Sequence, residues 1–349
     1  MTRVRVLPLA FVLLCLTPCL PVPPIGTAQA AIATPFLDAH THIVRYLRRG
    51  RSLEAAAAEA LRLMDRFGET AGILAPPPFP PDRQGAYGVR QLSSLVHDHP
   101  GRFAFTAGGD SLNPMIQQTP PDQVTPDVLR RFAQAAEAIV RGGAAGFGEL
   151  AAEHFSARTG SHPYESAPPD HPLFLALADI AAHADVPIEL HMEAVPRDMP
   201  FPNLALMGPP NPPAVRENIS ALERLLEHNP KTRVIWLHAG WDLSGYRTVP
   251  LMRSLLSRHP NLYMSLKVDK RGAPPTSPFA PGGGLKPGWA ALLRDFPDRL
   301  VIGSDQFFDE DPQRIAAARR IVDALPPEVV RLITIENVKR LYHVPSLMP

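Results

Sequence analysis

Short apolar segments recur along the chain and alternate with longer segments that have helical periodicity. Each apolar segment has the length and composition of a parallel strand that is buried on both faces. The spacing of successive segments accommodates a loop, a helix and a return loop. The predicted strands cover residues 34–38, 71–75, 103–107, 145–149, 187–191, 234–238, 262–266 and 300–304.

The segments between these strands have the apolar spacing of amphipathic helices. Residues 52–67 are rich in alanine and leucine and end at Gly68, and residues 219–228 place their aliphatic side chains on one face. Eight strand and helix units predict an α/β fold, a single-domain (β/α)8 TIM barrel. An open doubly wound sheet is the alternative. No glycine-rich fingerprint follows the first strand, where Asp38-Ala39-His40 stands instead.

The first thirty residues have the features of a secretory signal. Arg3 and Arg5 give a positive start, an apolar run covers residues 7–20, and Ala28-Gln29-Ala30 forms a small-residue cleavage site. The run is interrupted by proline and is too short for a membrane-spanning helix. We expect residues 1–30 to be a cleaved signal peptide and residues 31–349 to form the barrel. The mature protein is then periplasmic or secreted, without a membrane anchor; an uncleaved anchor is the alternative.

Composition narrows the kinds of ligand and partner. The 2 cysteines, Cys15 and Cys19, both fall within the signal segment, so the mature protein has none. Any metal site must therefore use nitrogen and oxygen ligands. Removing Arg3 and Arg5 from the 35 Lys and Arg residues leaves 33 against 34 Asp and Glu. This near-neutral balance gives no reason to expect a nucleic acid or an anionic membrane as a partner.

Histidines and an aspartate stand at the ends of several predicted strands. His40 and His42 are two positions apart on an extended segment, so their side chains point to the same face. The others stand at the ends of the fifth, sixth and eighth strands: His191, His238 and Asp305. Chemistry in such barrels occurs at the carboxyl ends of the strands, so we expect these side chains to meet around a divalent metal. A second pair, His97 and His99, precedes a strand and is expected in a solvated turn at the opposite end.

These residues and the end of the chain resemble the amidohydrolase superfamily of metal-dependent hydrolases, in particular its amidohydrolase-related group. The resemblance covers the whole mature chain. It includes a C-terminal segment similar to the family's Asn-Ala-x-Arg-Leu-Phe. The matching segments are Asp38-Ala39-His40-Thr41-His42, His191, His238, Asp305 and Glu336-Asn337-Val338-Lys339-Arg340-Leu341-Tyr342.

Glu149 ends the fourth predicted strand and bears on the number of ions. Members of the family carry at this position a carboxylated lysine, a glutamate or no ligand. The segment Phe147-Gly148-Glu149-Leu150 resembles the Gly-Glu segment of TatD-like deoxyribonucleases, where the glutamate belongs to a two-metal site. Glu149 is therefore expected either to bridge two ions or to orient a ligand by hydrogen bonding.

The resemblance implies a site with one or two ions, with Zn²⁺ expected and Mn²⁺ or Fe²⁺ as alternatives. With one ion, the implied ligands are His40, His42, His191 and Asp305. His238 then polarises the scissile carbonyl or stabilises the oxyanion. With two ions, Glu149 bridges and His238 binds the second ion. In both arrangements Asp305 takes the proton from a metal-bound water and passes it to the leaving group.

Arg45, Trp241 and Lys267 are candidates for substrate binding, and an inward basic side chain would favour an anionic group on the substrate. The sequence thus predicts an exported metal-dependent hydrolase of a small molecule with an amide, ester, lactone or related bond. A metal-dependent decarboxylase of an aromatic or unsaturated acid is the alternative. A non-catalytic metal-containing barrel is less favoured, because Asp305 is a proton acceptor that a structural site would not need. The near-neutral charge argues against a deoxyribonuclease, and neither the substrate nor the oligomeric state is indicated.

Overall fold

The computed structural model describes residues 34–48, 52–80, 83–157, 163–269 and 275–347. The chain divides into a leading segment, Met1–Ala33, and a compact unit, Thr34–Pro349. The predicted signal and its cleavage site belong to the leading segment and lie outside the described residues. Among the described residues, none of the helices has the length and apolar character needed to cross a membrane.

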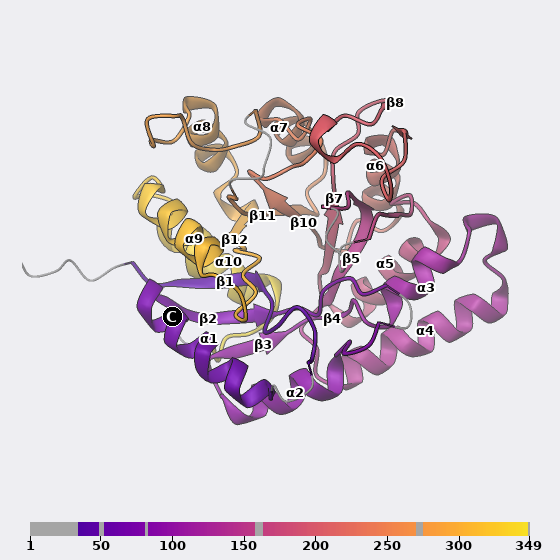
Figure 1. Cartoon of the computed structure of the whole chain (residues 1–349), viewed down its shortest axis with the longest axis horizontal. Coiled ribbons are helices and arrows are strands. Elements are labelled where there is room, and N and C mark those ends of the chain that lie inside the picture. The colour runs from indigo at the N-terminus through magenta and orange to yellow at the C-terminus, as the bar shows by residue number, and fades with distance from the viewer. Residues whose placement is uncertain (1–33, 49–51, 81–82, 158–162, 270–274, 348–349) are drawn as a thin grey trace, which may run out of the picture. The chain divides into compact units, whose positions relative to one another are not determined.

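Parallel strands form the centre of the compact unit (Figure 1). Hydrogen bonding orders them β1-β2-β3 in one sheet and β4-β5-β7-β10-β11-β12 in the other. The third predicted strand is split into β3 and β4, with Thr106 between them. The strands are β1 Phe36–Thr41, β2 Glu69–Leu74, β3 Phe103–Phe105, β4 Ala107–Gly108, β5 Phe147–His154, β7 Ile188–Met192, β10 Val234–Ala239, β11 Leu262–Leu266 and β12 Leu300–Ile302.

Backbone hydrogen bonds join the two sheets at both edges. At one edge the amide of His42 donates to Gln306 at 2.8 Å, and the amide of Asp305 donates to His40 at 2.9 Å. At the other edge the amide of Ala145, before β5, donates to Phe105 of β3 at 2.7 Å. The strands therefore follow one another around a ring in sequence order, and the predicted (β/α)8 TIM barrel is confirmed.

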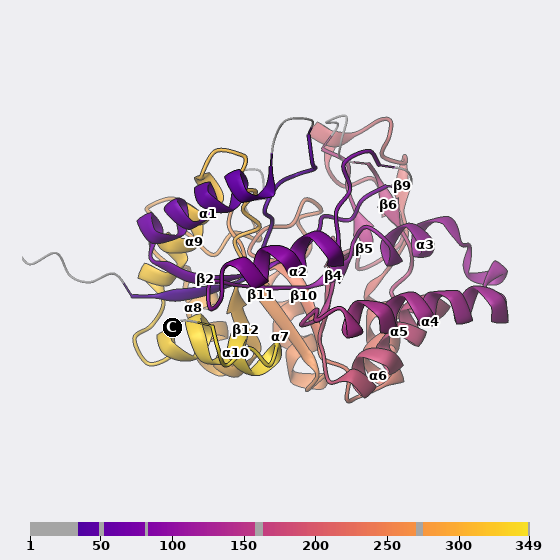
Figure 2. The ribbon, with the colours of Figure 1, turned by 90° about the horizontal axis from the view of Figure 1, so that it is seen from below.

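Helices lie on the outside of the strands in both ribbon views (Figures 1 and 2). The largest apolar cluster lies between the helices and the strands, as the amphipathic patterns predict. In α1, the Ser52 hydroxyl caps the first turn and Gly68, with φ 72°, ends the helix. The helices are α1 Leu53–Phe67, α2 Val89–Asp98, α3 Leu112–Gln118, α4 Pro126–Arg141, α5 Pro172–Ala184, α6 Ile219–His228, α7 Val249–Arg258, α8 Pro287–Asp295 and α9 Gln313–Ala324, with short turns η1 Pro121–Gln123 and η3 Pro297–Arg299.

The C-terminal segment closes the amino-terminal end of the barrel. It consists of the π-helical turn η4, Leu332–Glu336, the helix α10, Asn337–Leu341, and the residues that follow. Its apolar side chains pack against the first halves of strands from different parts of the ring, including Leu37, Ile235 and Val301. We call this group the barrel floor; its C-terminal members are Ile335, Val338, Leu341, Tyr342, Val344 and Leu347.

The opposite end of the barrel carries longer loops. Strand β5 continues beyond the ring and pairs with the short antiparallel strand β6, Glu165–Ser166, which is why it runs past the predicted end at Glu149. The loop after β7 holds β8 Met199–Pro200, η2 Leu204–Leu206 and β9 Ala214–Val215. A separate apolar cluster fixes this loop to the residues after β10 and includes Phe201, Trp241 and Leu243.

Candidate metal centre

The six predicted ligands lie at the carboxyl ends of five strands and converge at the barrel mouth. Their ligand atoms form two groups, within each of which all atoms lie within 4.8 Å of one another. The first group is His40, His42, Glu149 and Asp305; the second is Glu149, His191 and His238. His97 and His99 belong to neither of the two groups found among the described residues. His99 instead follows α2 and packs against Phe103 at the start of β3, which confirms that this pair lies at the other end. The predicted turn is wrong for His97, which is exposed but belongs to the last turn of α2.

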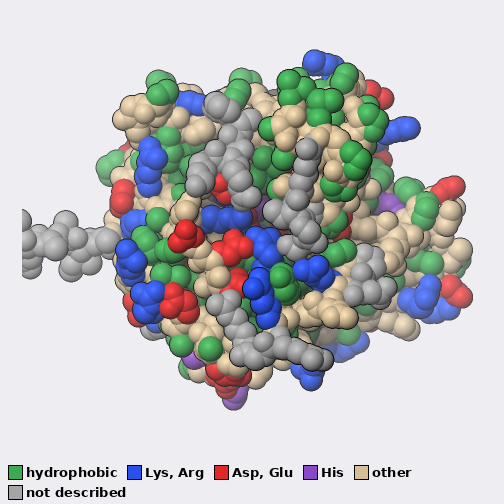
Figure 3. Space-filling model, viewed as in Figure 1, with side chains coloured by type: hydrophobic (Ala, Val, Ile, Leu, Met, Phe, Trp, Pro, Cys, Tyr) green, Lys and Arg blue, Asp and Glu red, His purple; other side chains and the backbone are tan. Residues whose placement is uncertain are grey.

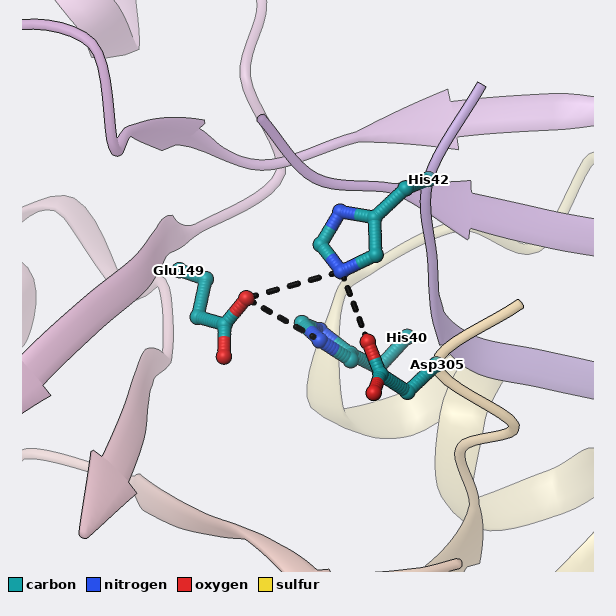
Figure 4. Close-up of side chains that lie close together, drawn as sticks. All are labelled: His40, His42, Glu149 and Asp305. Atoms are coloured by element: carbon teal, nitrogen blue, oxygen red, sulfur yellow. Dashed lines mark hydrogen bonds and ion pairs between the residues drawn. The ribbon is translucent and has the colours of Figure 1, made fainter. Parts of the chain in front are cut away.

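In the first group, side chains from opposite parts of the ring face one another (Figure 4). The Nε2 atom of His42 lies 2.9 Å from Asp305 Oδ1 and 3.5 Å from Glu149 Oε2. The Nε2 atom of His40 lies 3.7 Å from the same Glu149 oxygen. Two imidazole nitrogens from the end of β1 and one carboxylate oxygen from the loop after β12 thus surround one point next to Glu149.

The second group lies on the other side of Glu149. The Oε1 atom of Glu149 lies 2.7 Å from Nδ1 of His191. The rings of His191 and His238 meet edge to face, with their centroids 4.7 Å apart. The one-ion arrangement expected from the resemblance combines His191 with Asp305, whereas these distances put the two in different groups. Glu149 stands between the groups, with one carboxylate oxygen turned to each, as a bridging ligand requires.

Hydrogen bonds fix which ring nitrogen His40, His42 and His191 present to the centre. Nδ1 of His42 lies 2.8 Å from the carbonyl of Ala75, so it must carry the proton and Nε2 is the acceptor that faces the mouth. Nδ1 of His40 lies 2.9 Å from Glu189, and Nε2 of His191 lies 3.1 Å from Glu193. Each of these three rings is therefore anchored through one nitrogen and offers its other nitrogen to the centre, as is usual for histidines that bind metal.

The electrostatics of the centre keep both central carboxyl groups ionised. Burial would raise the pKa of Asp305, but the positive charges of Arg314 and Lys267 hold it well below its usual value. Burial likewise opposes ionisation of Glu149, and the neighbouring His191 and His40 hold its pKa well below the usual value. Burial and the positive charge of Lys267 lower the pKa of His238 far below its ordinary value, so this imidazole is neutral.

A divalent cation fits these residues. The Nε2 atoms of His40 and His238 are buried and have no hydrogen-bond partner among the described residues, which is costly unless a ligand binds them. The carboxylates of Glu149, Glu189, Glu193 and Asp305 are buried here, whereas the cations beside them are Lys267 and Arg314. The resulting excess of negative charge, with imidazole and carboxylate donors and no thiol, suits a divalent metal.

Two of these side chains stand on strained backbone. His238 has φ 71° and Asp305 has φ 57°, in the left-handed region that residues other than glycine rarely adopt. His238 is the last residue but one of β10, and Asp305 stands three positions after the end of β12, in the mouth loop. Such strain persists only where surrounding structure imposes it, and it concentrates at functional sites.

A cavity of about 560 Å³ opens above the two groups. All three predicted substrate contacts line it. Lys267 contacts Asp305 of the first ligand group, and its Nζ atom lies 3.7 Å from the centre of the Trp241 ring. Trp241 in turn packs edge to face against His238 of the second group. Arg45 lies at the rim, where it pairs with Glu310 at 2.7 Å and packs over Phe307. Figure 3 shows basic and acidic side chains close together near the middle of the face in view.

Sequence reasoning missed three residues that contact the predicted ligands. Arg314 of α9 lies 2.7 Å from Asp305, but nothing in the pattern around it marks it. Glu189 and Glu193 hydrogen-bond to His40 and His191. Both stand two positions from His191, Glu189 on β7 and Glu193 directly after it, so the alternation of side chains along extended backbone could have identified them.

Comparison with known proteins agrees with this geometry. The profile of the amidohydrolase family matches residues 37–344. No curated protein matches the chain. Among solved structures, the chain is similar to 4-oxalomesaconate hydratase from Rhodopseudomonas palustris, with 13% identity, a TM-score of 0.51, and 88% of this chain and 95% of that chain covered. It is also similar to a dihydroxybenzoic acid decarboxylase from Polaromonas sp. JS666 with bound manganese, at 15% identity and a TM-score of 0.49, with 89% and 97% covered.

Identity at this level establishes a common fold and no more. The family profile extends from the second residue of β1 into the barrel floor, so it includes all six predicted ligands and both ends of the barrel. The chain therefore belongs to the amidohydrolase family.

Proposed function

We propose that this protein is a metal-dependent hydrolase that cleaves an amide, ester, lactone or related bond in a small molecule. The observation that supports this most is the pair of ligand groups that share Glu149 at the base of a cavity of about 560 Å³. Cavities of this size hold small organic molecules. The two ligand groups lie at the carboxyl ends of the strands, the end of the barrel at which TIM-barrel enzymes of many kinds carry out their chemistry.

The proposed ligands are His40, His42, Glu149, His191, His238 and Asp305, with Glu149 between two ions. Zn²⁺ suits imidazole and carboxylate donors; Mn²⁺ and Fe²⁺ are alternatives. When bound, the metal lowers the pKa of a water molecule and polarises the oxygen of the scissile group.

Asp305 is the proposed proton carrier. Its ionised carboxylate belongs to the first ligand group and also lines the cavity, within reach of Lys267 and Arg314. It can accept a proton from the attacking water and return it to the leaving atom. Lys267 and Arg314 keep it ionised until then, because they stabilise the charged form.

The same two cations favour a substrate with an anionic group. Lys267 is 1% exposed and Arg314 is 13% exposed, so both hold positive charge in a largely dehydrated place. In the metal-loaded site they share Asp305 with a dication, and the other carboxylate beside them among the described residues is Asp269, 3.6 Å from Arg314. One carboxylate for two cations leaves positive charge. A carboxylate or similar group of the substrate would balance it. Trp241, packed against Lys267, would then contact the apolar part of the molecule.

A decarboxylase of an aromatic or unsaturated acid is the second candidate, because the same cations could hold the carboxylate that leaves. The test is a panel of carboxylate-bearing esters, lactones, amides and aromatic acids, assayed with the protein loaded with Zn²⁺ or Mn²⁺ and with the chelated protein. Metal-dependent hydrolysis without release of CO₂ supports the proposal. Release of CO₂ supports the second candidate, and turnover that survives chelation contradicts both.

We also propose that residues 1–30 are a cleaved signal peptide and that the mature protein is periplasmic or secreted. The positive start, the apolar run and the Ala28-Gln29-Ala30 segment support this. Mass spectrometry of the protein from its native host should find an N-terminus at Ala31. A full-length mass in the cytoplasm would contradict the proposal.

A further inference from the structure

Strand β7 carries more of the metal centre than one ligand. The sequence around His191 is Glu189-Leu190-His191-Met192-Glu193, in which Glu193 directly follows β7 and its amide still donates to Glu153 of β5. Both glutamates therefore alternate onto the same side of the extended chain as the histidine. Glu193 anchors His191 itself, at 3.1 Å from Nε2. Glu189 instead reaches across to His40 of β1, at 2.9 Å from Nδ1. One strand therefore orients a histidine in each of the two ligand groups.

The two glutamates are held very differently. Glu189 is fully buried, and each of its oxygens has a partner: Oε2 accepts from His40 and from the Thr106 hydroxyl at 3.3 Å, and Oε1 accepts from the Tyr342 hydroxyl at 2.7 Å. In Glu193, Oε1 has no partner among the described residues. The orientation of Glu189 is thus fixed from both sides, whereas that of Glu193 is fixed through His191.

Tyr342 belongs to the barrel floor, at the far end of the barrel from the cavity. Its side chain is 2% exposed, and its hydroxyl lies 2.7 Å from Glu189 and 3.0 Å from the carbonyl of Ala39. The hydroxyl has a single proton, and the shorter contact to the charged carboxylate takes it. A continuous hydrogen-bonded chain therefore runs from the C-terminal segment through Glu189 to the ligand His40.

We propose that Tyr342 is a positioning residue that, through Glu189, sets the metal affinity of the group that contains His40. Glu193 has the corresponding role for the group that contains His191. This inference rests on the proposed function, since it takes both groups to bind metal. It makes the end of the chain, which touches neither cavity nor ligand, a determinant of how tightly one ion is held.

The physical reason is the geometry of the acceptor. Without the Tyr342 hydroxyl, Oε1 of Glu189 would lose its donor in a place closed to water, and the carboxylate would turn toward its remaining donors. His40 would then lose the fixed direction of its ring. Loss of a partner that orients a metal-bound histidine typically costs about 10–100-fold in metal affinity.

The test is a Co²⁺ titration of the chelator-treated full chain, followed by absorption spectra and equilibrium dialysis. We expect two classes of site in the unaltered protein. Tyr342→Phe should weaken one class by about 10-fold or more and leave the other unchanged, and Glu193→Gln should weaken the other class. In a Glu189→Gln background, Tyr342→Phe should have little further effect, because the two residues act in series.

Tyr87→Phe is the matched control. The Tyr87 hydroxyl is also buried and donates to a backbone carbonyl, that of Val44 at 2.7 Å, but no hydrogen bond links it to a histidine of the centre. If Tyr342→Phe and Tyr87→Phe bind Co²⁺ alike, the proposed link is wrong. If the unaltered protein binds a single equivalent, selective weakening by Tyr342→Phe still supports the link. If it binds none, the proposed function itself fails.

Discussion

The two ends of this barrel are built from the same strands but differ in chemistry. At the mouth, buried imidazoles, carboxylates and a lysine lie together, and two of the side chains stand on left-handed backbone. At the barrel floor, apolar side chains of the C-terminal segment pack against apolar side chains of the strands. Burial of apolar surface stabilises the floor, whereas burial of charge and backbone strain destabilise the mouth.

This difference indicates a division of labour. The floor and the outer shell of helices supply the stability that the mouth lacks without its metal. Changes at the mouth should therefore alter activity far more than folding. Changes to the apolar side chains of the floor should do the reverse, whereas Tyr342 is linked to the mouth through its hydroxyl. Each of the following measurements tests this separation.

The largest effect is expected from His238→Gln at the mouth. Activity should fall at least about 100-fold, because a ligand of the ion that would stabilise the developing charge is lost. The free energy of unfolding of the metal-free protein should change by less than about 1 kcal/mol, because Nε2 of His238 has no partner to lose among the described residues. Steady-state kinetics and urea unfolding measure the two. The same change at the exposed His97 is the control and should leave both unaltered.

At the floor, Ile335→Ala should lower the free energy of unfolding by about 2–5 kcal/mol, because it leaves a cavity in a closely packed cluster. Activity of the remaining folded protein should stay within about twofold. Leu204→Ala, at a side chain that is 80% exposed, is the control and should not affect stability. If Ile335→Ala reduced activity as strongly as His238→Gln, the two ends would not be separable.

Glu165 gives a smaller, pH-dependent effect at the mouth. Burial raises its pKa from 4.5 to about 8, although Asn113 donates to it at 2.9 Å. The native state therefore favours the protonated carboxyl group: its contribution to stability is fully present below pH 4.5 and is lost as pH rises toward 8. The loss is at most about 1.4 kcal/mol for each pH unit in this range.

Glu165→Gln should remove that dependence. The variant of the chelated protein should match the unaltered protein at pH 4 and exceed its unfolding free energy at pH 8. Thermal unfolding at several pH values measures the difference. If the unfolding free energies of the two proteins changed with pH in parallel, ionisation of Glu165 would not destabilise the native state.

The smallest effect is expected outside both ends. Arg130 and Asp127 pair on the surface of α4, with side chains that are 61% and 73% exposed. Arg130→Ala should change the free energy of unfolding by no more than about 0.5 kcal/mol, since water and salt screen such pairs. A larger loss in urea unfolding would mean that the outer shell contributes more through its charges than this comparison assumes.

The sequence predicted the ring of strands because each strand is apolar for most of its length. Its errors fall where the strands become polar. Strand β1 was expected to end at Asp38, but it continues to Thr41 and carries His40 within it. A pattern of apolar positions cannot follow a strand into the residues that serve the site.

Some of the site was also beyond the sequence. The ends of strands could be matched to one another, which brought the six candidate ligands together. Arg314 could not be found, since its approach to Asp305 depends on the loop between β12 and α9 and on no spacing rule. The link from Tyr342 to Glu189 depends on where the C-terminal segment enters the barrel, which only the folded chain reveals.

The closure of the barrel has a further consequence for biosynthesis. His42 and Asp305, which meet at 2.9 Å, are separated by 263 residues and come from the first strand and the last. A ribosome must therefore release nearly the whole chain before the first ligand group can assemble, and long loop closure slows such contacts. Nascent or truncated chains would expose an incomplete ligand set that cannot hold an ion as the finished ring does. We therefore expect the first ligand group to bind its ion only after Asp305 has been synthesised and the ring has closed.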